Sequence, residues 1–119
     1  MSVSTRDDVT VPRVDLVFDN ECPHVHDARA LLRTAIAGAG FPATWREWER
    51  GAAETPAELR GLGSPTILVD GVDVSGAEPV DRLFERANCC RVYENGGRLW
   101  GVPSLEAVAM ALSRGRMTT

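Results

Sequence analysis

The sequence of 119 residues lacks any continuous run of about 18 apolar residues, which a membrane helix would need. Its opening stretch is polar and carries Asp7 and Asp8 where a signal peptide would need an apolar segment. A basic excess is also missing: 13 Lys and Arg against 17 Asp and Glu leave a net charge of -4, which argues against a general nucleic-acid binder. We therefore expect a cytoplasmic protein that binds neither a membrane nor nucleic acid.

Several catalytic motifs are absent as well. The sequence has no glycine-rich phosphate loop and no Gly-x-Ser-x-Gly elbow, which argues against nucleotide-binding and acyl-hydrolase functions. Its three cysteines are an odd number, whereas a disulfide scaffold uses an even number in an oxidising compartment. We therefore expect reduced thiols that serve catalysis, redox chemistry or metal binding.

The composition is that of one globular domain, with 44% apolar and 25% charged residues. We expect residues 1–10 to be a flexible tail and residues 11–119 to form the domain. Apolar periodicity and turn residues predict strands over 13–18, 43–49, 66–69 and 72–74. They also predict three helices. The first begins at Pro23 and ends around 38–40, the second covers 55–62, and the third begins at 103–104 and ends before Gly115.

This order of elements predicts an α/β fold with a central mixed β-sheet of about four strands flanked by helices. The Asp70-Gly71 pair is a strong signal for the hairpin that joins the last two strands. The tryptophans are expected to pack rather than to bind a cofactor: Trp45, Trp48 and Trp100. The charged residues of the second strand region are expected to form a solvated face: Arg46, Glu47, Glu49 and Arg50.

Cys22 stands at the predicted junction between the first strand and the first helix. A thiol there lies near the positive end of the helix dipole and near free backbone N–H groups, and both favour the thiolate. Such junctions at sheet ends are also where α/β folds place their sites. The alternative is that Cys22 is a small buried apolar residue, which is the commonest fate of a free cysteine.

Two histidines follow this cysteine. His24 is a candidate proton donor or a stabiliser of the Cys22 thiolate, whereas His26 is expected to be an exposed helix residue. Helical residues two apart point to different sides, so the pair is not expected to chelate one ion.

Residues 18–23 and 63–71 resemble two segments of the thioredoxin-like superfamily. In that family a cis-proline opens a strand and hairpin, faces the active cysteine, and has neighbouring backbone that binds the sulfur-bearing substrate. The resemblance implies that Pro65 is a cis-proline beside Cys22. It also implies that Ser64, Pro65 and Thr66 contribute to substrate binding.

More narrowly, the chain is similar to small bacterial thioredoxin-family proteins described as alkylmercury-lyase-like. The shared motifs, which span nearly all of residues 13–115, are Cys22-Pro23, Gly63 to Thr66, Cys90 to Tyr93 and Gly101 to Ser104. Alkylmercury lyases hold mercury with two distant cysteines and deliver a proton from an aspartate. Asp19 or Asp27 is the candidate acid here, although neither matches the lyase spacing, and the chain is too short for the lyases' additional domain.

The chain also departs from the thioredoxin pattern. Val25 stands where a thioredoxin has its second cysteine, so a resolving thiol would have to be Cys89 or Cys90. A disulfide between these two would be strained, because adjacent Cα atoms lie ~3.8 Å apart. Alternatively, both thiolates and Cys22 form a soft site for Hg(II), Cu(I) or Zn(II), or one of the two packs in the core.

The sequence thus predicts a thiol-dependent protein in which Cys22 acts with Cys89 or Cys90. The enzyme hypothesis has two versions, an organomercurial lyase-like reaction and thiol–disulfide exchange. Neither requires a cofactor, and the substrate would be a small thiol, disulfide or organometallic compound. The alternative is a non-catalytic carrier of Hg, Cu or Zn, and a third is an interaction module with inert cysteines. We expect a monomer or small homo-oligomer.

Overall fold

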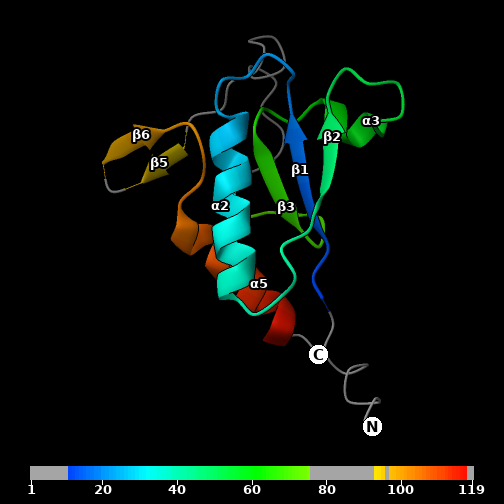
Figure 1. The fold of residues 1–119 in the computed structure, drawn as a ribbon. Coiled ribbons are helices and arrows are strands. Elements are labelled where there is room, and N and C mark those ends of the chain that lie inside the picture. Colours follow the sequence, from blue (N-terminus) through cyan, green and yellow to red (C-terminus); the bar gives the residue numbers. More distant parts are fainter. Residues whose placement is uncertain (1–10, 76–92, 96, 118–119) are drawn as a thin grey trace, which may run out of the picture.

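The computed structural model describes residues 11–75, 93–95 and 97–117 (Figure 1). The proposed tail over 1–10 and the cysteines Cys89 and Cys90 lie outside these described residues. The elements in chain order are β1 (Val14–Phe18), α2 (Val25–Gly38), β2 (Arg46–Glu49), α3 (Ala57–Arg60), β3 (Thr66–Val69), β4 (Val72–Asp73), β5 (Tyr93–Asn95), β6 (Arg98–Trp100) and α5 (Leu105–Met117). No helix within these ranges is long and apolar enough to cross a membrane.

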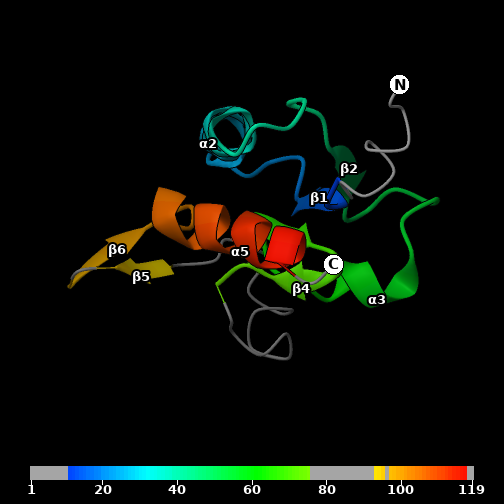
Figure 2. The ribbon, with the colours of Figure 1, turned by 90° about the horizontal axis from the view of Figure 1, so that it is seen from below.

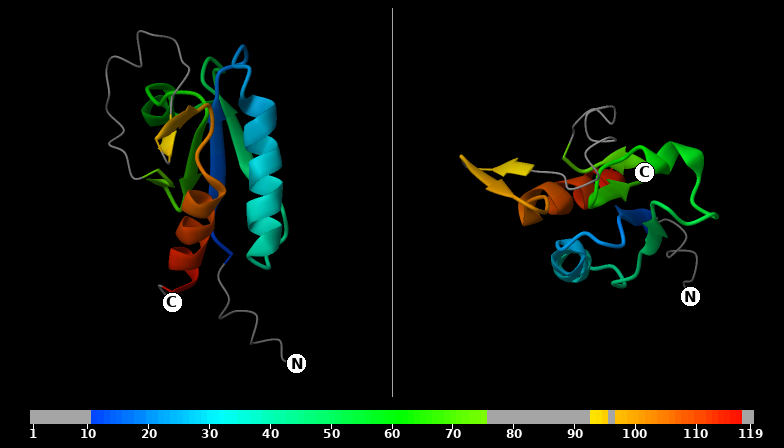
Figure 3. Two further views of the ribbon diagram at one scale, coloured as in Figure 1. Left: turned by 90° about the vertical axis from the view of Figure 1, so that its left-hand side faces the viewer. Right: turned by 90° about the horizontal axis from the view of Figure 1, so that it is seen from above.

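The central sheet has four strands in the order β2-β1-β3-β4. β1 runs parallel to β2 and antiparallel to β3, and β4 pairs antiparallel with β3. The expectation of an α/β fold with a mixed sheet of about four strands is confirmed. A separate hairpin of β5 and β6 was not expected, and it projects past the start of α5, away from the sheet (Figures 2 and 3).

The main core lies on one face of the sheet, where α2 and α5 pack side by side (Figure 2). Alternation along β1 turns Val14 and Leu16 toward these helices. The buried residues of α2 recur every three or four positions and form the facing stripe: Val25, Ala28, Leu32, Ala35 and Ile36. A smaller cluster around Val17, Leu62 and Leu68 covers the opposite face near α3.

Some element ends differ from the sequence prediction because local contacts set them. Helix α2 begins after Pro23, with His24 as its N-cap and no side-chain capping bond. Helix α3 is shorter than predicted, and Thr55 does not cap it, because the Thr55 hydroxyl donates to the Glu49 carbonyl at 2.6 Å. Helix α5 continues through Gly115, which was expected beyond its end.

The turn signals were more reliable. Asp70 and Gly71 both have positive φ, 54° and 84°, which is the backbone of a type I′ hairpin turn. The start of α5 is set by Ser104, whose Oγ accepts the Ala107 N–H at 3.0 Å.

The charged residues in and after β2 are not simply a solvated face. Arg46 and Glu47 are exposed as expected, but all four side chains make specific contacts. Arg46 pairs with Asp15, Glu47 with Arg29 and Trp45, Glu49 with two backbone N–H groups, and Arg50 with Asp19 and a carbonyl. β2 is an edge strand, and its charged side chains reach across to neighbouring segments.

Trp100 was expected to pack, and this prediction is wrong, because 45% of the residue is exposed and Arg98 lies over its ring.

A bidentate ion pair joins α2 to β2. Arg29 Nε and Nη2 each donate to a Glu47 carboxylate oxygen at 2.9 Å, and the Trp45 indole N–H adds a third bond. The hydrogen bonds from Arg29 hold the pKa of Glu47 below its ordinary value of 4.5, and those with Glu47 raise the pKa of Arg29. A lowered folded-state pKa means that the pair stabilises the fold above the unfolded pKa and loses this contribution as the pH falls through the folded pKa.

Replacing Glu47 with Gln is therefore expected to lower the free energy of unfolding by about 0.5 kcal/mol at pH 7, because solvent screens this partly exposed pair. The difference from the parent should shrink as the pH falls below 4.5. Urea unfolding at several pH values measures it, with the exposed Glu58→Gln in α3 as control. A difference that does not vary with pH would contradict the assignment.

The two glycines at the end of α2 are expected to respond oppositely to alanine. Gly38 is the last helical residue, and an added Cβ there would meet nothing within 4 Å. Gly40 has a φ of +89°, and the Phe41 N–H returns to the Ile36 carbonyl at 3.2 Å, as in a Schellman end. Gly38→Ala should raise the free energy of unfolding by about 0.5–1 kcal/mol and Gly40→Ala should lower it by about 1 kcal/mol. Urea unfolding measures both variants, and changes of the same sign in their free energies of unfolding would contradict the opposite roles of the two glycines.

Candidate functional site

Cys22 lies in the loop between β1 and α2, where the sequence placed it. Its side chain is buried, with 9% of the residue exposed, and it is a free thiol. Its Sγ lies 3.8 Å from the carbonyl oxygen of Ser64, a residue 42 positions away in the sequence. The thiol of the first loop therefore meets the segment that precedes β3.

The loop that carries this thiol is fixed by hydrogen bonds. The backbone N–H groups of residues 19–22 donate, in chain order, to Ser64 Oγ at 2.8 Å, Glu49 Oε2 at 3.1 Å, Asp19 Oδ1 at 2.9 Å and the Asp19 carbonyl at 2.9 Å. These four N–H groups are therefore not available to the Cys22 sulfur. They have been used to hold the loop, so any free donors must come from the uncapped first turn of α2.

Asp19 belongs to the same loop. One carboxylate oxygen accepts the Glu21 N–H, and the other lies 3.7 Å from Arg50 Nη1. Arg50 also donates to the Arg60 carbonyl, so it ties the loop to the end of α3. The carboxylate is part of the loop's bracing, and its role as a proton donor stays a prediction. Asp27, the other candidate acid, is exposed in the first turn of α2.

The segment Ser64–Thr66 is buried beside the thiol. The Ser64–Pro65 peptide bond is cis, as the resemblance implied. The Thr66 hydroxyl donates to the Gly63 carbonyl at 2.7 Å, and the phenol hydroxyl of Tyr93 donates to the Pro65 carbonyl. These three residues therefore form a fixed wall, and the Ser64 carbonyl is the atom of this wall that contacts Cys22.

His24 lies on another side of the site and is half-buried. Its ring packs directly on Gly101, since a Cβ built at that glycine would lie 2.5 Å from the His24 Cγ and Nδ1. Within the described residues, His24 makes no hydrogen bond with Cys22. His26 is exposed, as predicted.

The structure thus brings together Cys22, Ser64 and Pro65, and it adds Tyr93 and Gly101, to which the sequence analysis gave no role. Both belong to motifs of the family resemblance, but periodicity and spacing carry no signal for contacts made across the fold. In the described part of the chain, no three His, Cys, Asp or Glu residues are grouped as a metal site. The predicted soft-metal site also needs Cys89 and Cys90, which lie outside it.

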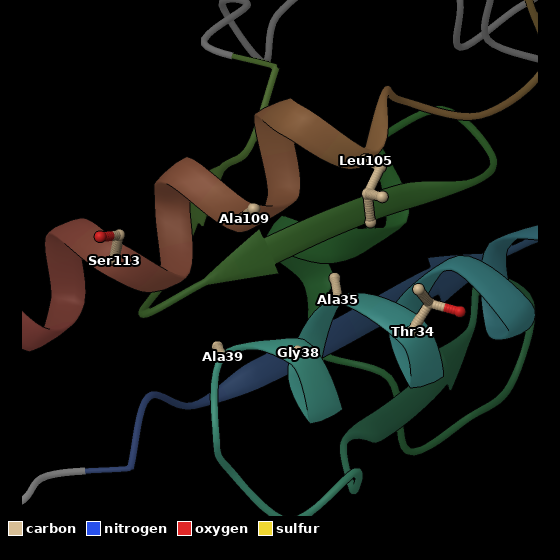
Figure 4. Close-up of a pocket in the computed structure, with 7 residues that line it drawn as sticks. All are labelled: Thr34, Ala35, Gly38, Ala39, Leu105, Ala109 and Ser113. Atoms are coloured by element: carbon tan, nitrogen blue, oxygen red, sulfur yellow. The ribbon is translucent and has the colours of Figure 1, made fainter.

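A groove of about 410 Å³ separates the C-terminal half of α2 from α5 (Figure 4). It exists because small side chains face one another there, among them Ala35, Gly38, Ala109 and Ser113. None of the candidate thiol-site residues lines it. The groove is therefore a feature separate from the Cys22 site.

No protein-family model, curated protein or solved structure matches this chain.

Proposed function

We propose that this chain is a thiol-dependent protein of thioredoxin-like fold that acts through Cys22 together with Cys89 or Cys90. The observation that carries the proposal is the contact of 3.8 Å between the Cys22 Sγ and the Ser64 carbonyl. It supports the expected pairing of a cysteine before the first helix with the proline segment that opens a strand. The β3–β4 hairpin that follows supports the same comparison.

In thiol–disulfide exchange the Cys22 thiolate attacks one sulfur of a small disulfide and displaces the other as a thiolate. Cys89 or Cys90 then attacks the Cys22 sulfur and releases the second substrate thiol. The substrate disulfide is reduced to two thiols, and the protein is left with one disulfide. Because Cys22 is only 9% exposed, we expect substrates small enough to enter beside the Ser64 carbonyl.

In the organomercurial version the thiolates bind mercury, and the carbon–mercury bond breaks as a proton reaches the carbon. The electron pair of that bond takes up the proton, and Hg(II) stays on the sulfurs, so no oxidant is needed. His24 and Asp19 are the candidate proton donors near the cysteine loop. Of these, the His24 imidazole has no hydrogen-bond partner among the described residues, whereas the Asp19 carboxylate is paired with Arg50.

One observation favours the alternative of a soft-metal carrier. Position 25 is a buried valine in the first turn of α2, so the chain lacks the local pair of cysteines that a thioredoxin uses, and any second sulfur must come from Cys89 or Cys90. A carrier needs only sulfurs that converge on one ion, and soft thiolates select thiophilic metals. Such a protein would bind the ion stoichiometrically, gain stability and turn nothing over.

Alkylation by iodoacetamide with mass mapping of each cysteine tests the proposal, with and without one equivalent of Hg(II). We expect mercury to protect Cys22 together with Cys89 or Cys90, and we expect this joint protection to disappear in the Cys22→Ser variant. Assays of organomercurial cleavage and disulfide reduction then separate the two reactions from a carrier. If all three thiols react slowly and independently of mercury, the proposal fails and the cysteines are inert.

A further inference from the structure

Tyr93 is the single tyrosine of the chain and the first residue of β5. Its side chain is buried, and its hydroxyl donates to the Pro65 carbonyl at the start of β3. The bond links the β5–β6 hairpin, which stands apart from the central sheet, to the wall of the Cys22 site (Figures 1 and 3). Nothing in the proposed reaction yet requires this bond.

The bond acts on the peptide group next to the one that contacts sulfur. The Ser64 carbonyl, which faces the thiol, and the Pro65 carbonyl, which faces the phenol, lie on consecutive residues. Proline has no N–H and a fixed φ, so this short segment has few backbone torsions left to vary. Holding the Pro65 carbonyl therefore also restricts where the Ser64 carbonyl can lie relative to the Cys22 sulfur.

The other end of the hairpin makes a second contact with the site. Gly101 follows β6 directly, and its Cα lies against the ring of His24, where no Cβ would fit without moving the imidazole. The hairpin thus contacts the Cys22 loop on the His24 side and the Ser64–Pro65 segment on the other. The hairpin therefore bridges the two segments that carry the reactive groups.

We propose that Tyr93 is a positioning residue for Cys22: its hydroxyl fixes the Pro65 carbonyl and thereby keeps the Ser64 carbonyl against the thiol. This inference deepens the proposed function and rests on it for any effect on turnover. It also has a consequence that is independent of turnover. A group attached to the Cys22 sulfur must displace the Ser64 carbonyl, and the displacement must reach the Tyr93 ring.

The experiment uses the full chain labelled with ¹³C at the tyrosine ring, which gives the resonance of one residue. We expect alkylation of Cys22 by iodoacetamide to shift this resonance. The same treatment of Cys22→Ser, in which only Cys89 and Cys90 react, should leave the resonance unchanged. An unshifted resonance in the alkylated parent protein overturns the inference, and this measurement needs no variant of Tyr93.

The second arm compares Tyr93→Phe, which keeps the ring and removes the hydroxyl, with Trp100→Phe on the same hairpin. Under conditions where circular dichroism shows both folded, Tyr93→Phe should accelerate Cys22 alkylation by roughly threefold to tenfold, as expected for the loss of one hydrogen bond. Trp100→Phe should react at the parent rate. A parent-like rate in Tyr93→Phe overturns the inference, whereas failure of mercury to protect Cys22 in the parent protein overturns only the proposed function.

Discussion

Replacing Asp15 with alanine is expected to lower the free energy of unfolding by about 2 kcal/mol. Asp15 is only 3% exposed, although it is the second residue of an otherwise apolar strand, β1. One of its oxygens accepts the Trp48 indole N–H at 2.9 Å and Arg46 Nε at 3.3 Å, and the other accepts Arg13 Nε at 3.2 Å. The carboxylate therefore ties β1 to β2 on the face of the sheet opposite α2 and α5.

The size of this effect follows from where its partners lie. The side chains of Arg13 and Arg46 are 57% and 61% exposed, so water can solvate them once the carboxylate is gone. Most of the lost stability comes from the half-buried Trp48 N–H, which loses its acceptor, and from the space that the missing carboxylate leaves behind. The cost should therefore be smaller than the 3–5 kcal/mol typical of breaking a fully buried ion pair.

Urea unfolding followed by circular dichroism measures this change. Asp15→Asn retains an acceptor oxygen for Trp48 and should cost less than Asp15→Ala. Glu54→Ala serves as the control, because Glu54 is exposed and has no side-chain partner among the described residues, and its effect should stay within about 0.5 kcal/mol. An Asp15→Ala variant as stable as this control would show that the carboxylate contributes nothing to the fold.

Replacing Ser64 with alanine is expected to lower the free energy of unfolding by about 1–2 kcal/mol and to speed the alkylation of Cys22. The Ser64 side chain is fully buried, and its Oγ accepts the Asp19 N–H at 2.8 Å. Alanine leaves that N–H without its acceptor at the start of the cysteine loop. The loop should then open more often, and each opening exposes a thiol that is otherwise buried.

Both effects are measurable on one preparation, by urea unfolding and by mass-mapped alkylation of Cys22. Ser113→Ala is the matched control and should change neither quantity, because Ser113 is exposed and lines the groove that is separate from the Cys22 site. If Ser64→Ala loses stability but Cys22 reacts at the parent rate, the hydroxyl supports the fold without controlling access to the thiol.

Much of the fold could be predicted because its signals are local. The apolar spacing of α2 acts over one or two helical turns, and the Asp70-Gly71 turn sets φ at two adjacent residues. The place of Cys22 between β1 and α2 follows from the same signals. The end of α2 shows their limit, because the sequence left open which glycine ends the helix, and the backbone assigns the positive φ to Gly40.

Other features could not be predicted, because they depend on residues far apart in the chain. The Cys22 loop is held by acceptors 29 and 45 positions away, Glu49 and Ser64, whose roles depend on how β1, β2 and β3 pair. The short β5–β6 hairpin carries too few residues for a clear period, and its contacts from Tyr93 and Gly101 reach distant segments.

The sequence alone therefore determined the local elements, the hairpin turn and the position of the thiol before a helix. Short-range sterics and apolar periodicity act within a few residues, so they can be read along the chain. Only the tertiary structure decided which atoms face that thiol and which residues brace its loop. Those contacts form when the packing of strands and helices brings distant segments together, and the spacing of residues along the sequence does not show which segments will meet.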